Sequence, residues 1–393
     1  MPGVGQPVST LQGVPAQNVS IDPQAFFPAT RRLTYAMQSV QPIAGLGSTD
    51  TVQLRQTGII AALDVRIAGT ITFGGTITGT TMSWRWPYNL FTARVSANGQ
   101  ANLINAPGLL LQALSMTQGQ ITDRGVQRAI GAGTPNQGTL ARASDSWGSD
   151  GTNELGPGVT VAAAGTYDVD FVVRIPLAFD QRTLLGAVFA QTAQTNLVLD
   201  LDYAPQSELL TLGGAATFAH ALTWEVAGVV YTIPQVGGRF VVPDLSAFHQ
   251  FVATGTNAVG QGENELMLPG TGIGRQLMRV YGQVYTGAAP GVPLAVNAAN
   301  YGPMGWRYGG NDTPEMHRTG SSLRSRNEET TGVDLGGQWG IWAHDFASEW
   351  ALRDAVDEGA TSDLRLVVGL QAAPATPRVV IAQQTIFAAP VGA

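Results

Sequence analysis

The stretch IIAALDVRIAGTITF, residues 59–73, alternates apolar and polar side chains along most of its length. Leu63, Val65 and Ile67 fall on one side of this alternation, and Asp64 and Arg66 fall on the other. Successive side chains of a β-strand point to opposite faces of its sheet, so a period of two indicates one face on a core and one in water. The stretch therefore predicts a long, half-buried strand.

The same alternation recurs along the rest of the chain. It is found at residues 169–177, 197–202, 222–226, 278–284 and 364–370. Glycine and proline number 49 and 22 of 393 residues, well above the ~12% of an average protein, so turns should be frequent. About eight strands in each half, separated by Gly and Pro turns, favour an all-β fold of two tandem eight-stranded jelly rolls, a double jelly roll, with short inter-strand helices.

One such helix is expected after Pro107. The apolar residues there have the spacing of a single helix face: Leu109, Leu110, Ala113 and Met116. A helix with an apolar face packs that face against a core or a partner. We expect this helix to cover part of the core or to lie in an interface.

The two halves also share a strand-helix-strand pattern. In the first half Asp180 follows a strand and offers an N-cap for a helix over residues 181–191. In the second half Asp345 stands in the same place before a helix over residues 346–356. A further strand follows each helix. This repeat predicts that one domain has been duplicated.

Changes of pattern along the chain suggest its domain boundaries. Residues 1–50 are rich in Pro, Gly and Gln and are expected to form an N-terminal arm. The first jelly roll is assigned to residues 51–233 and the second to residues 234–393. Within the second, the polar stretch at about 301–338 is expected to project as a long loop, because loops of this length usually carry function.

The composition excludes several kinds of chemistry. The chain has no cysteine and no lysine, so all 21 basic residues are arginines. Disulfides, thiolate nucleophiles, Schiff bases and P-loop lysines are therefore absent. Only 12% of residues are charged, about half the usual fraction, which suggests that much of the outside meets other protein. The net charge of −7 and the lack of a basic stripe argue against direct, sequence-specific nucleic-acid binding.

Catalytic and metal sites find little support. The histidines are His220, His249, His317 and His344, and their spacing matches no metal-binding motif. We therefore expect no catalytic residue, no metal and no cofactor, and interpret the protein as structural and not as an enzyme. A glycosidase using Glu328 or Glu329 is a weak alternative, because adjacent carboxylates on a loop rarely face each other across a cleft.

Aromatic residues support a stronger alternative function. Trp306 and Tyr308 lie in the stretch expected to project as a loop, where they could form an exposed interaction surface. Aromatic side chains also fill cores and subunit interfaces, which is the commoner role. A receptor- or glycan-binding spike or lectin with a jelly-roll fold is therefore the alternative hypothesis to a structural protein.

Three segments carry a resemblance to a known family. The run Ile175-Pro-Leu-Ala-Phe-Asp, the run Leu185-Gly-Ala-Val-Phe-Ala-Gln and the run Asn196-Leu-Val-Leu-Asp-Leu resemble the strand, helix and strand in the first jelly roll of tectivirus major capsid proteins. Residues 242–246 and 338–370 are similar in position to their counterparts in the second. The resemblance covers residues 50 to 387, and only the block from Ile175 to Leu201 is specific at residue level.

The resemblance implies a structural role in a virus. A major capsid protein of this family forms a homotrimer of pseudo-hexagonal outline, which tiles the icosahedral shell of a tailless double-stranded DNA bacteriophage with an internal membrane. The implied partners are neighbouring trimers, vertex (penton) proteins and minor capsid proteins. The protein would be found in the virion capsid after assembly in the cytoplasm of the host bacterium, and the stretch 301–338 would form an outward tower.

The resemblance also implies an inner surface. The family has an N-terminal helix that faces the membrane, whereas here prolines interrupt the first fifty residues. Arg31 and Arg32, followed by Leu33, Tyr35 and Met37, form a short amphipathic piece in this region. Arg31 and Arg32 are therefore the candidate membrane-side residues, with the internal lipid membrane as a candidate partner.

Overall fold

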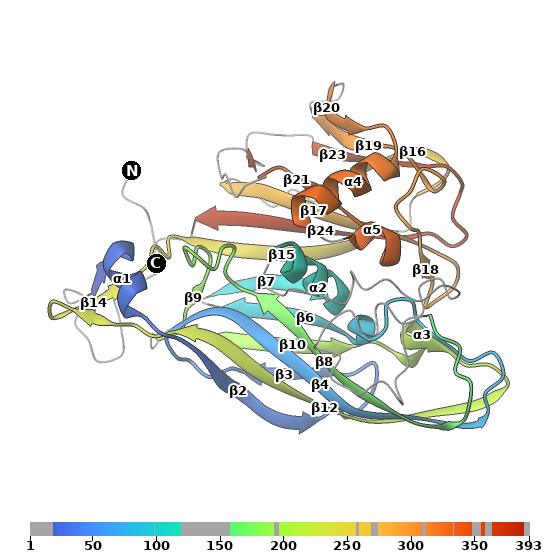
Figure 1. Cartoon of the computed structure of the whole chain (residues 1–393), viewed down its shortest axis with the longest axis horizontal. Helices are drawn as coiled ribbons and strands as arrows, with labels where there is room; N and C mark the ends of the chain where they lie inside the picture. The colour runs from blue at the N-terminus through green and yellow to red at the C-terminus, as the bar shows by residue number, and fades with distance from the viewer. Residues whose placement is uncertain are drawn as a thin grey trace.

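The computed structural model consists mainly of β-strands arranged in two sandwiches (Figure 1). It describes residues 19–97, 99–118, 158–191, 196–256, 259–268, 274–308, 312–332, 334–347, 355–357 and 364–388. Among these residues, no helix is long and apolar enough to cross a membrane.

The first sandwich contains eight strands in two sheets. One sheet has the order β2-β12-β4-β8 and the other has the order β3-β10-β6-β7. Their bounds are β2 Arg32–Pro42, β3 Thr49–Gln53, β4 Ile59–Thr76, β6 Phe91–Ala97, β7 Gln100–Pro107, β8 Gly165–Pro176, β10 Leu197–Tyr203 and β12 Ala215–Tyr231. Numbered along the chain, the first sheet joins strands one, eight, three and six, and the second joins two, seven, four and five.

The second sandwich repeats this topology strand for strand. Its sheets have the orders β15-β24-β17-β21 and β16-β23-β19-β20. Their bounds are β15 Ala247–Thr256, β16 Gly262–Met267, β17 Arg275–Thr286, β19 Tyr301–Tyr308, β20 Asp312–His317, β21 Ile341–Asp345, β23 Leu364–Leu370 and β24 Arg378–Ala388. The prediction of two tandem eight-stranded jelly rolls is confirmed.

Shorter elements connect these strands. The helices are α1 Pro23–Ala29, the 3-10 turn η2 Tyr88–Leu90, α2 Gly108–Thr117, α3 Gln206–Leu209, α4 Gly320–Thr331 and α5 Leu335–Gln338. The short strands are β1 Val19–Ile21, β5 Thr81–Met82, β9 Val188–Phe189, β11 Leu210–Thr211, β13 Gln235–Val236, β14 Arg239–Val242, β18 Val292–Pro293 and β22 Val356–Asp357. In both jelly rolls a helix, α2 or α4, lies between the fifth and sixth strands.

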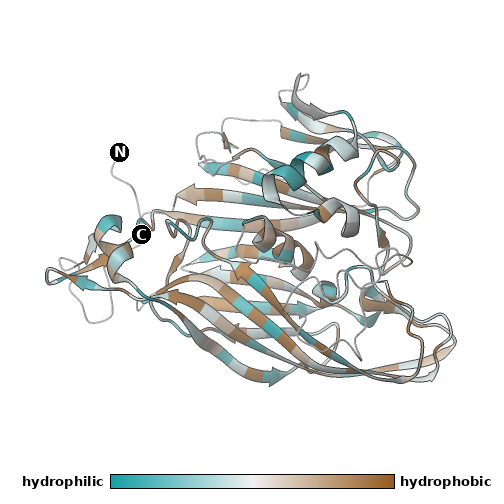
Figure 2. Cartoon of the chain, viewed as in Figure 1, coloured by the Kyte–Doolittle hydropathy of each residue, from teal (hydrophilic) through white to brown (hydrophobic). Residues whose placement is uncertain are grey.

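The alternation seen in the sequence explains how β4 is buried. Leu63, Val65 and Ile67 are fully buried, whereas Arg66 on the opposite face is exposed. Figure 2 shows the same alternation of hydrophobic and hydrophilic bands along β4 and β12. Burying a Leu or Val side chain stabilises the fold by about 1.5–3 kcal/mol, so these inward faces hold the two sheets together.

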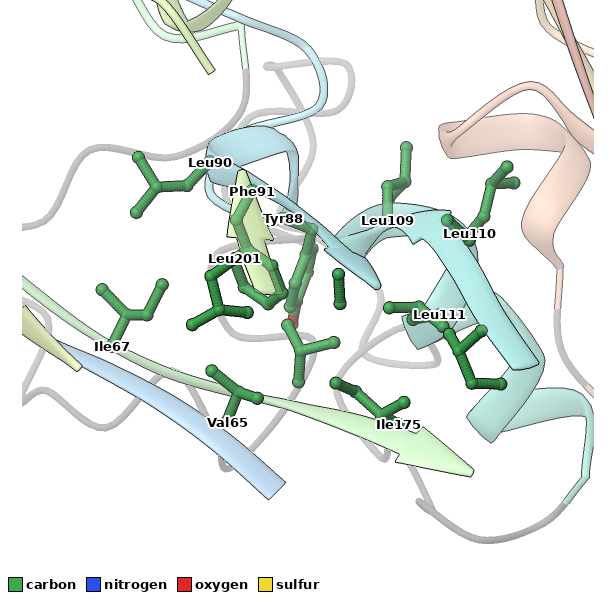
Figure 3. Close-up of a cluster of buried hydrophobic side chains, with 14 of the residues drawn as sticks. Val65, Ile67, Tyr88, Leu90, Phe91, Leu109, Leu110, Leu111, Ile175 and Leu201 are labelled. Atoms are coloured by element: carbon green, nitrogen blue, oxygen red, sulfur yellow. The ribbon is translucent and has the colours of Figure 1, made fainter. Parts of the chain in front are cut away.

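Helix α2 forms where the sequence predicts it and closes one end of the first core. All ten of its residues are buried. Figure 3 shows Leu111 of α2 near Ile175 of β8, in one cluster with Val65 and Ile67 of β4 and Tyr88 of η2. Because every residue of α2 is buried, including the polar Gln112, Ser115 and Thr117, the helix has packing partners on all of its sides.

The helix predicted over residues 181–191 does not form. Leu184 and Gly186 have φ angles of 58° and 83°, which a right-handed helix does not tolerate. Val188 and Phe189 instead form β9, which pairs with Ile60 and Ile59 of β4. The carboxylate of Asp180 accepts a hydrogen bond from the backbone N–H of Arg182 at 2.9 Å, closing a turn and not a helix.

The prediction of a helix over residues 346–356 is wrong at the C-terminal end of this range. Residues 348–354 lie outside the described part of the chain, and Val356 belongs to strand β22. Asp345, predicted as an N-cap, is the last residue of β21. β22 pairs with β17 and β9 pairs with β4, and β17 and β4 are the third strands of their jelly rolls. The repeat is therefore present at the predicted places, but a short strand carries it.

The stretch 301–338 is folded and not a long loop. It contains β19, β20, α4 and α5. Helix α4 begins with a capping box between Thr319 and Ser322 and ends at Gly332, whose φ angle is 73°. Its surface is polar apart from Leu323, which explains why the sequence reads as a loop.

Strand pairing also changes the reading of the N-terminal arm. Residues 32–42, assigned to the arm from the sequence, form β2 and pair with β12. The boundary placed at 233/234 falls between β12 and β15. The remaining domain boundaries stay predictions.

Candidate assembly interface

The two jelly rolls are joined edge to edge. β7 is the edge strand of one sheet of the first jelly roll, and β15 is the edge strand of one sheet of the second. They pair in parallel, with Ile104 opposite Phe251 and Asn105 opposite Val252. Figure 1 shows the resulting stack, with β2 and β12 at the bottom and β19 and β20 at the top.

Helix α2 extends this joint through a buried polar chain. Arg279 of β17 donates to the hydroxyl of Tyr281 at 3.1 Å, and this hydroxyl lies 2.5 Å from that of Thr117 in α2. Thr117 in turn donates to the carbonyl of Leu114 at 2.9 Å. Arg279 also forms an ion pair with Asp345. Burial raises the pKa of Tyr281, so the phenol stays protonated and can donate to Thr117.

A cluster of charged residues, here called the Glu208 clamp, joins the two jelly rolls at a second place along their boundary, here called the seam. The carboxylate of Glu208 accepts hydrogen bonds from Arg85 at 2.7 Å and from Arg378 at 2.8 Å. Both guanidinium groups also donate to the carbonyl of Pro290, at 2.6 and 2.8 Å. The guanidinium carbon of Arg85 lies 4.6 Å from the ring centroid of Tyr285. Arg85 and Glu208 belong to the first jelly roll and the others to the second, so the clamp fixes the angle between them.

The core is continuous across this seam. The largest hydrophobic cluster contains the interior of the first jelly roll together with Phe251, Tyr281, Trp339 and Ala382 of the second. A large apolar contact of this kind opposes separate movement of the two domains. The two similar halves therefore share one core.

The outer face of sheet β2-β12-β4-β8 carries several ion pairs formed within the sheet. Arg66 donates two hydrogen bonds to Asp170, at 2.8 and 2.9 Å, and one to Glu225 at 2.9 Å. Arg174 makes a two-bond contact with Asp64, at 2.6 and 2.7 Å. The hydrogen bonds that Arg66 donates to Asp170 and Glu225 raise its pKa. A face with paired charges can meet another protein without burying an unpaired ion.

The far sheet of the second jelly roll has a similar arrangement. Arg307 and Arg365 both pair with the carboxylate of Glu265. Beside them on the edge strand β16, Met267 is 70% exposed. This face therefore combines paired charges with an exposed apolar side chain.

Arg31 and Arg32, predicted on the membrane side, are both exposed. They lie where α1 leads into β2, and the backbone N–H of Arg31 donates to the hydroxyl of Thr232 at 2.9 Å. Exposed Arg239 begins β14 in the adjoining sheet β1-β14-β13. Within the described part of the chain, the guanidinium groups of these three arginines form no ion pair.

Trp306 is not an exposed loop residue. It lies in β19 and is fully buried in the second core. Its ring centroid is 5.0 Å from that of His344 and 4.8 Å from that of Phe346. Tyr308 lies in the same strand, opposite Leu364. The burial of Trp306 removes the observation that favoured a glycan-binding platform, because a buried indole cannot stack on a sugar ring.

The other polar candidates that the structure describes lie on separate elements. Glu328 and Glu329 are exposed neighbours on α4. His249 and His344 are buried in strands, and burial lowers the pKa of His249 to about 4. In the described ranges, no group of three or more His, Asp or Glu side chains could hold a metal ion.

Sequence reasoning missed the residues that join the jelly rolls. Arg85, Glu208 and Arg378 are far apart along the chain: Arg85 lies in a turn, Glu208 in the short helix α3 and Arg378 at the start of β24. Thr117 and Tyr281 look like an ordinary helix end and an ordinary strand residue. The one usable signal was the apolar face of α2, which predicts a helix that covers a core or lies in an interface.

Comparisons with known proteins identify the fold. No protein-family model and no curated protein matches the sequence. Among solved structures, the crystal structure of the STIV MCP (STIV is Sulfolobus Turreted Icosahedral Virus) matches with a TM-score of 0.61 at 14% identity, covering 91% of this chain and 97% of that one. The major capsid protein P2 of bacteriophage PM2 gives a TM-score of 0.51 at 13% identity, over 92% and 98%. The Faustovirus major capsid protein gives 0.55 at 8%, over 92% and 91%.

These matches cover nearly the whole length of each chain, including both jelly rolls. At such low identity the likeness shows the fold: this chain is a double jelly roll of the kind found in viral capsid proteins of an archaeal virus, a bacteriophage and other viruses.

Proposed function

We propose that this protein is the major capsid protein of a virus and acts by assembly, not by catalysis. The observation that carries the proposal is the duplication: two jelly rolls of identical topology are joined by the β7·β15 pairing, the α2 seam and the Glu208 clamp. The STIV and PM2 structures, which this chain matches over nearly its whole length, are viral capsid proteins. Fold alone does not determine function. A chain of two firmly joined, similar domains is nevertheless suited to building a shell, because each copy offers two similar units to its neighbours.

The assembly unit we propose is a homotrimer. Three copies that each supply two similar domains make a ring of six similar domains, which packs into a lattice as a hexagon does. The low charge of 12% and the internally paired charges of the outer faces suit such lateral contacts. We propose the icosahedral shell of a tailless double-stranded DNA bacteriophage as its setting, with vertex and minor capsid proteins as partners and the virion as its location.

We propose that the end of the molecule bearing Arg31, Arg32 and Arg239 faces the internal membrane of such a virion. Ile21, 52% exposed, and Val236, 40% exposed, lie in the same small sheet as Arg239. Cations beside exposed apolar side chains suit an anionic lipid surface, where each arginine adds about 1 kcal/mol.

Vesicle co-sedimentation tests this surface. Vesicles with phosphatidylglycerol should bind the protein and vesicles of phosphatidylcholine alone should not. Replacing the three arginines with glutamine should abolish binding, and replacing paired Arg66 with glutamine should leave it unchanged. Equal binding to both vesicle types would contradict the proposal.

Solution mass tests the trimer. Light scattering of the purified chain at micromolar concentration should give three times the 41.1 kDa of one chain. An obligate trimer contact should bury on the order of 2,000 Å² or more, so it should survive dilution. A stable monomer would contradict the proposed function.

A further inference from the structure

Two edge strands of this chain have no strand partner on one side, and they occupy related positions in the two jelly rolls. The first strand of the first jelly roll, β2, and the fifth strand of the second, β20, are edge strands of their sheets. Among the described residues, neither has a strand on its second side. Edge strands present unpaired N–H and C=O groups and are templates for pairing with another chain.

The equivalent edges are already paired inside the chain. There the fifth strand of the first jelly roll, β7, pairs in parallel with the first strand of the second, β15. The two open edges are thus the remaining fifth strand and the remaining first strand. If the two jelly rolls are related by duplication, the same pairing is available between β20 of one copy and β2 of another.

The positions of the open edges fit a ring. β2 lies at the bottom of the stack and β20 at the top, on opposite sides of the folded molecule (Figure 1). One copy cannot pair them with each other, whereas copies arranged head to tail can. Head-to-tail contacts that close after a fixed rotation generate cyclic oligomers.

The exposed surface of β2 also suits a partner. Arg32, Thr34 and Ala36 are exposed, and Val40 is 57% exposed. Val40 is among the few large apolar side chains so exposed in the described structure. Pairing with a second strand would cover it.

We propose that β20 of one copy pairs in parallel with β2 of a second copy, reproducing between chains the β7·β15 contact found within the chain. The inference rests on the trimer proposed above and names the surface that builds it. Three such contacts, alternating with three β7·β15 contacts, close the ring of six jelly rolls.

Cysteine cross-linking tests this contact directly, because the chain contains no cysteine. In β15 the paired residues lie mid-strand, so the corresponding part of β2 is around Ala36, and Ala36→Cys is combined with Met316→Cys in β20. A short bis-maleimide should convert the double variant into covalent trimers, with dimers as intermediates. Each single variant should stay uncross-linked, and both should keep the circular dichroism spectrum of the parent.

A matched control distinguishes the edges. Met267 lies on β16, the other open edge of the same sheet as β20, and is exposed. Ala36→Cys combined with Met267→Cys should give no covalent trimer. Thr34→Cys with Met316→Cys provides a second test pair should Ala36→Cys disturb folding.

The outcomes separate this inference from the proposed function. Suppose that light scattering shows a trimer. Covalent trimers from the variant pair that contains Met267→Cys would then overturn the edge contact but not the trimer. The same holds if Met316→Cys gives no covalent trimer with either Ala36→Cys or Thr34→Cys. Covalent chains longer than three copies would overturn ring closure. A monomer in solution would overturn the trimer and the contact together.

Discussion

Oε1 of Glu208 lies 2.8 Å from Nη1 of Arg378, and this contact ties the first jelly roll to the last strand of the second. The other carboxylate oxygen accepts from Arg85 at 2.7 Å. One carboxylate therefore bridges two partly buried arginines, one from each jelly roll. The seam depends on this charge, since without it two cations would be left facing each other.

Glu208→Gln should weaken the fold while keeping its shape. We expect a loss of about 2 kcal/mol in the free energy of unfolding, because the amide leaves Arg85 and Arg378 without a counter-charge. Urea unfolding followed by tryptophan fluorescence measures it. Glu225→Gln is the matched control: Arg66 keeps its two bonds to Asp170 there, and we expect a change below about 0.5 kcal/mol. Equal losses in both variants would contradict the clamp.

His249 should make the protein less stable in acid. Its folded-state pKa is about 4, against an ordinary value of about 6.5 in the unfolded chain. Between these values the unfolded chain binds the extra proton, so stability should fall as pH decreases from about 6.5 to 4. The slope should reach about 1.4 kcal/mol per pH unit and the total about 3 kcal/mol.

Unfolding of the parent and of His249→Gln across this pH range measures the effect. Carboxylates titrate in both proteins, so the difference between them isolates the histidine. Curves that stay parallel from pH 7 to pH 4 would show that His249 accepts a proton in the folded state as readily as in the unfolded chain.

Trp306→Ala should damage the fold and not a binding surface. The side chain is fully buried against His344 and Phe346, and truncating a buried aromatic costs about 3–5 kcal/mol. Thermal unfolding measures the loss. Met267→Ala, at a side chain 70% exposed, should cost less than about 0.5 kcal/mol. A Trp306→Ala protein of unchanged stability that lost glycan binding would contradict this account.

Gly282→Ala should also be disruptive. Gly282 of β17 lies directly opposite Trp342 of β21, and a Cβ added there would come within 1.9 Å of the indole ring. The ring must move out of its packed position, so we expect a loss of about 1–3 kcal/mol. Gly255→Ala is the control, because its added Cβ would meet nothing nearer than 3.7 Å. Equal stability of the two variants would mean that Trp342 can shift freely.

Much of the fold could be predicted because its strands are long and half-buried. The alternation at 59–73 and 169–177 reports the inner and outer faces of β4 and β8 directly. The helix over 181–191 could not be separated from a strand, because Val188 and Phe189 are apolar in either structure. Their pairing with Ile59 and Ile60 is a long-range contact that the local pattern does not contain.

The interface residues were hidden for the same reason. Glu208 and Arg378 come into contact only when both jelly rolls have folded. The spacing of residues along the sequence does not predict this contact. Trp306 was misread because its neighbours are polar or glycine, whereas strand pairing turns its side chain into the second core. Arg31 and Arg32 are exposed, and their place on the membrane side stays a prediction.

Electron microscopy of the purified, untagged chain tests the central claim most directly. The account predicts particles of three subunits with a hexagonal outline, because each chain contributes two similar jelly rolls to one ring. Class averages showing single two-domain particles, or rings of any other copy number, would contradict it.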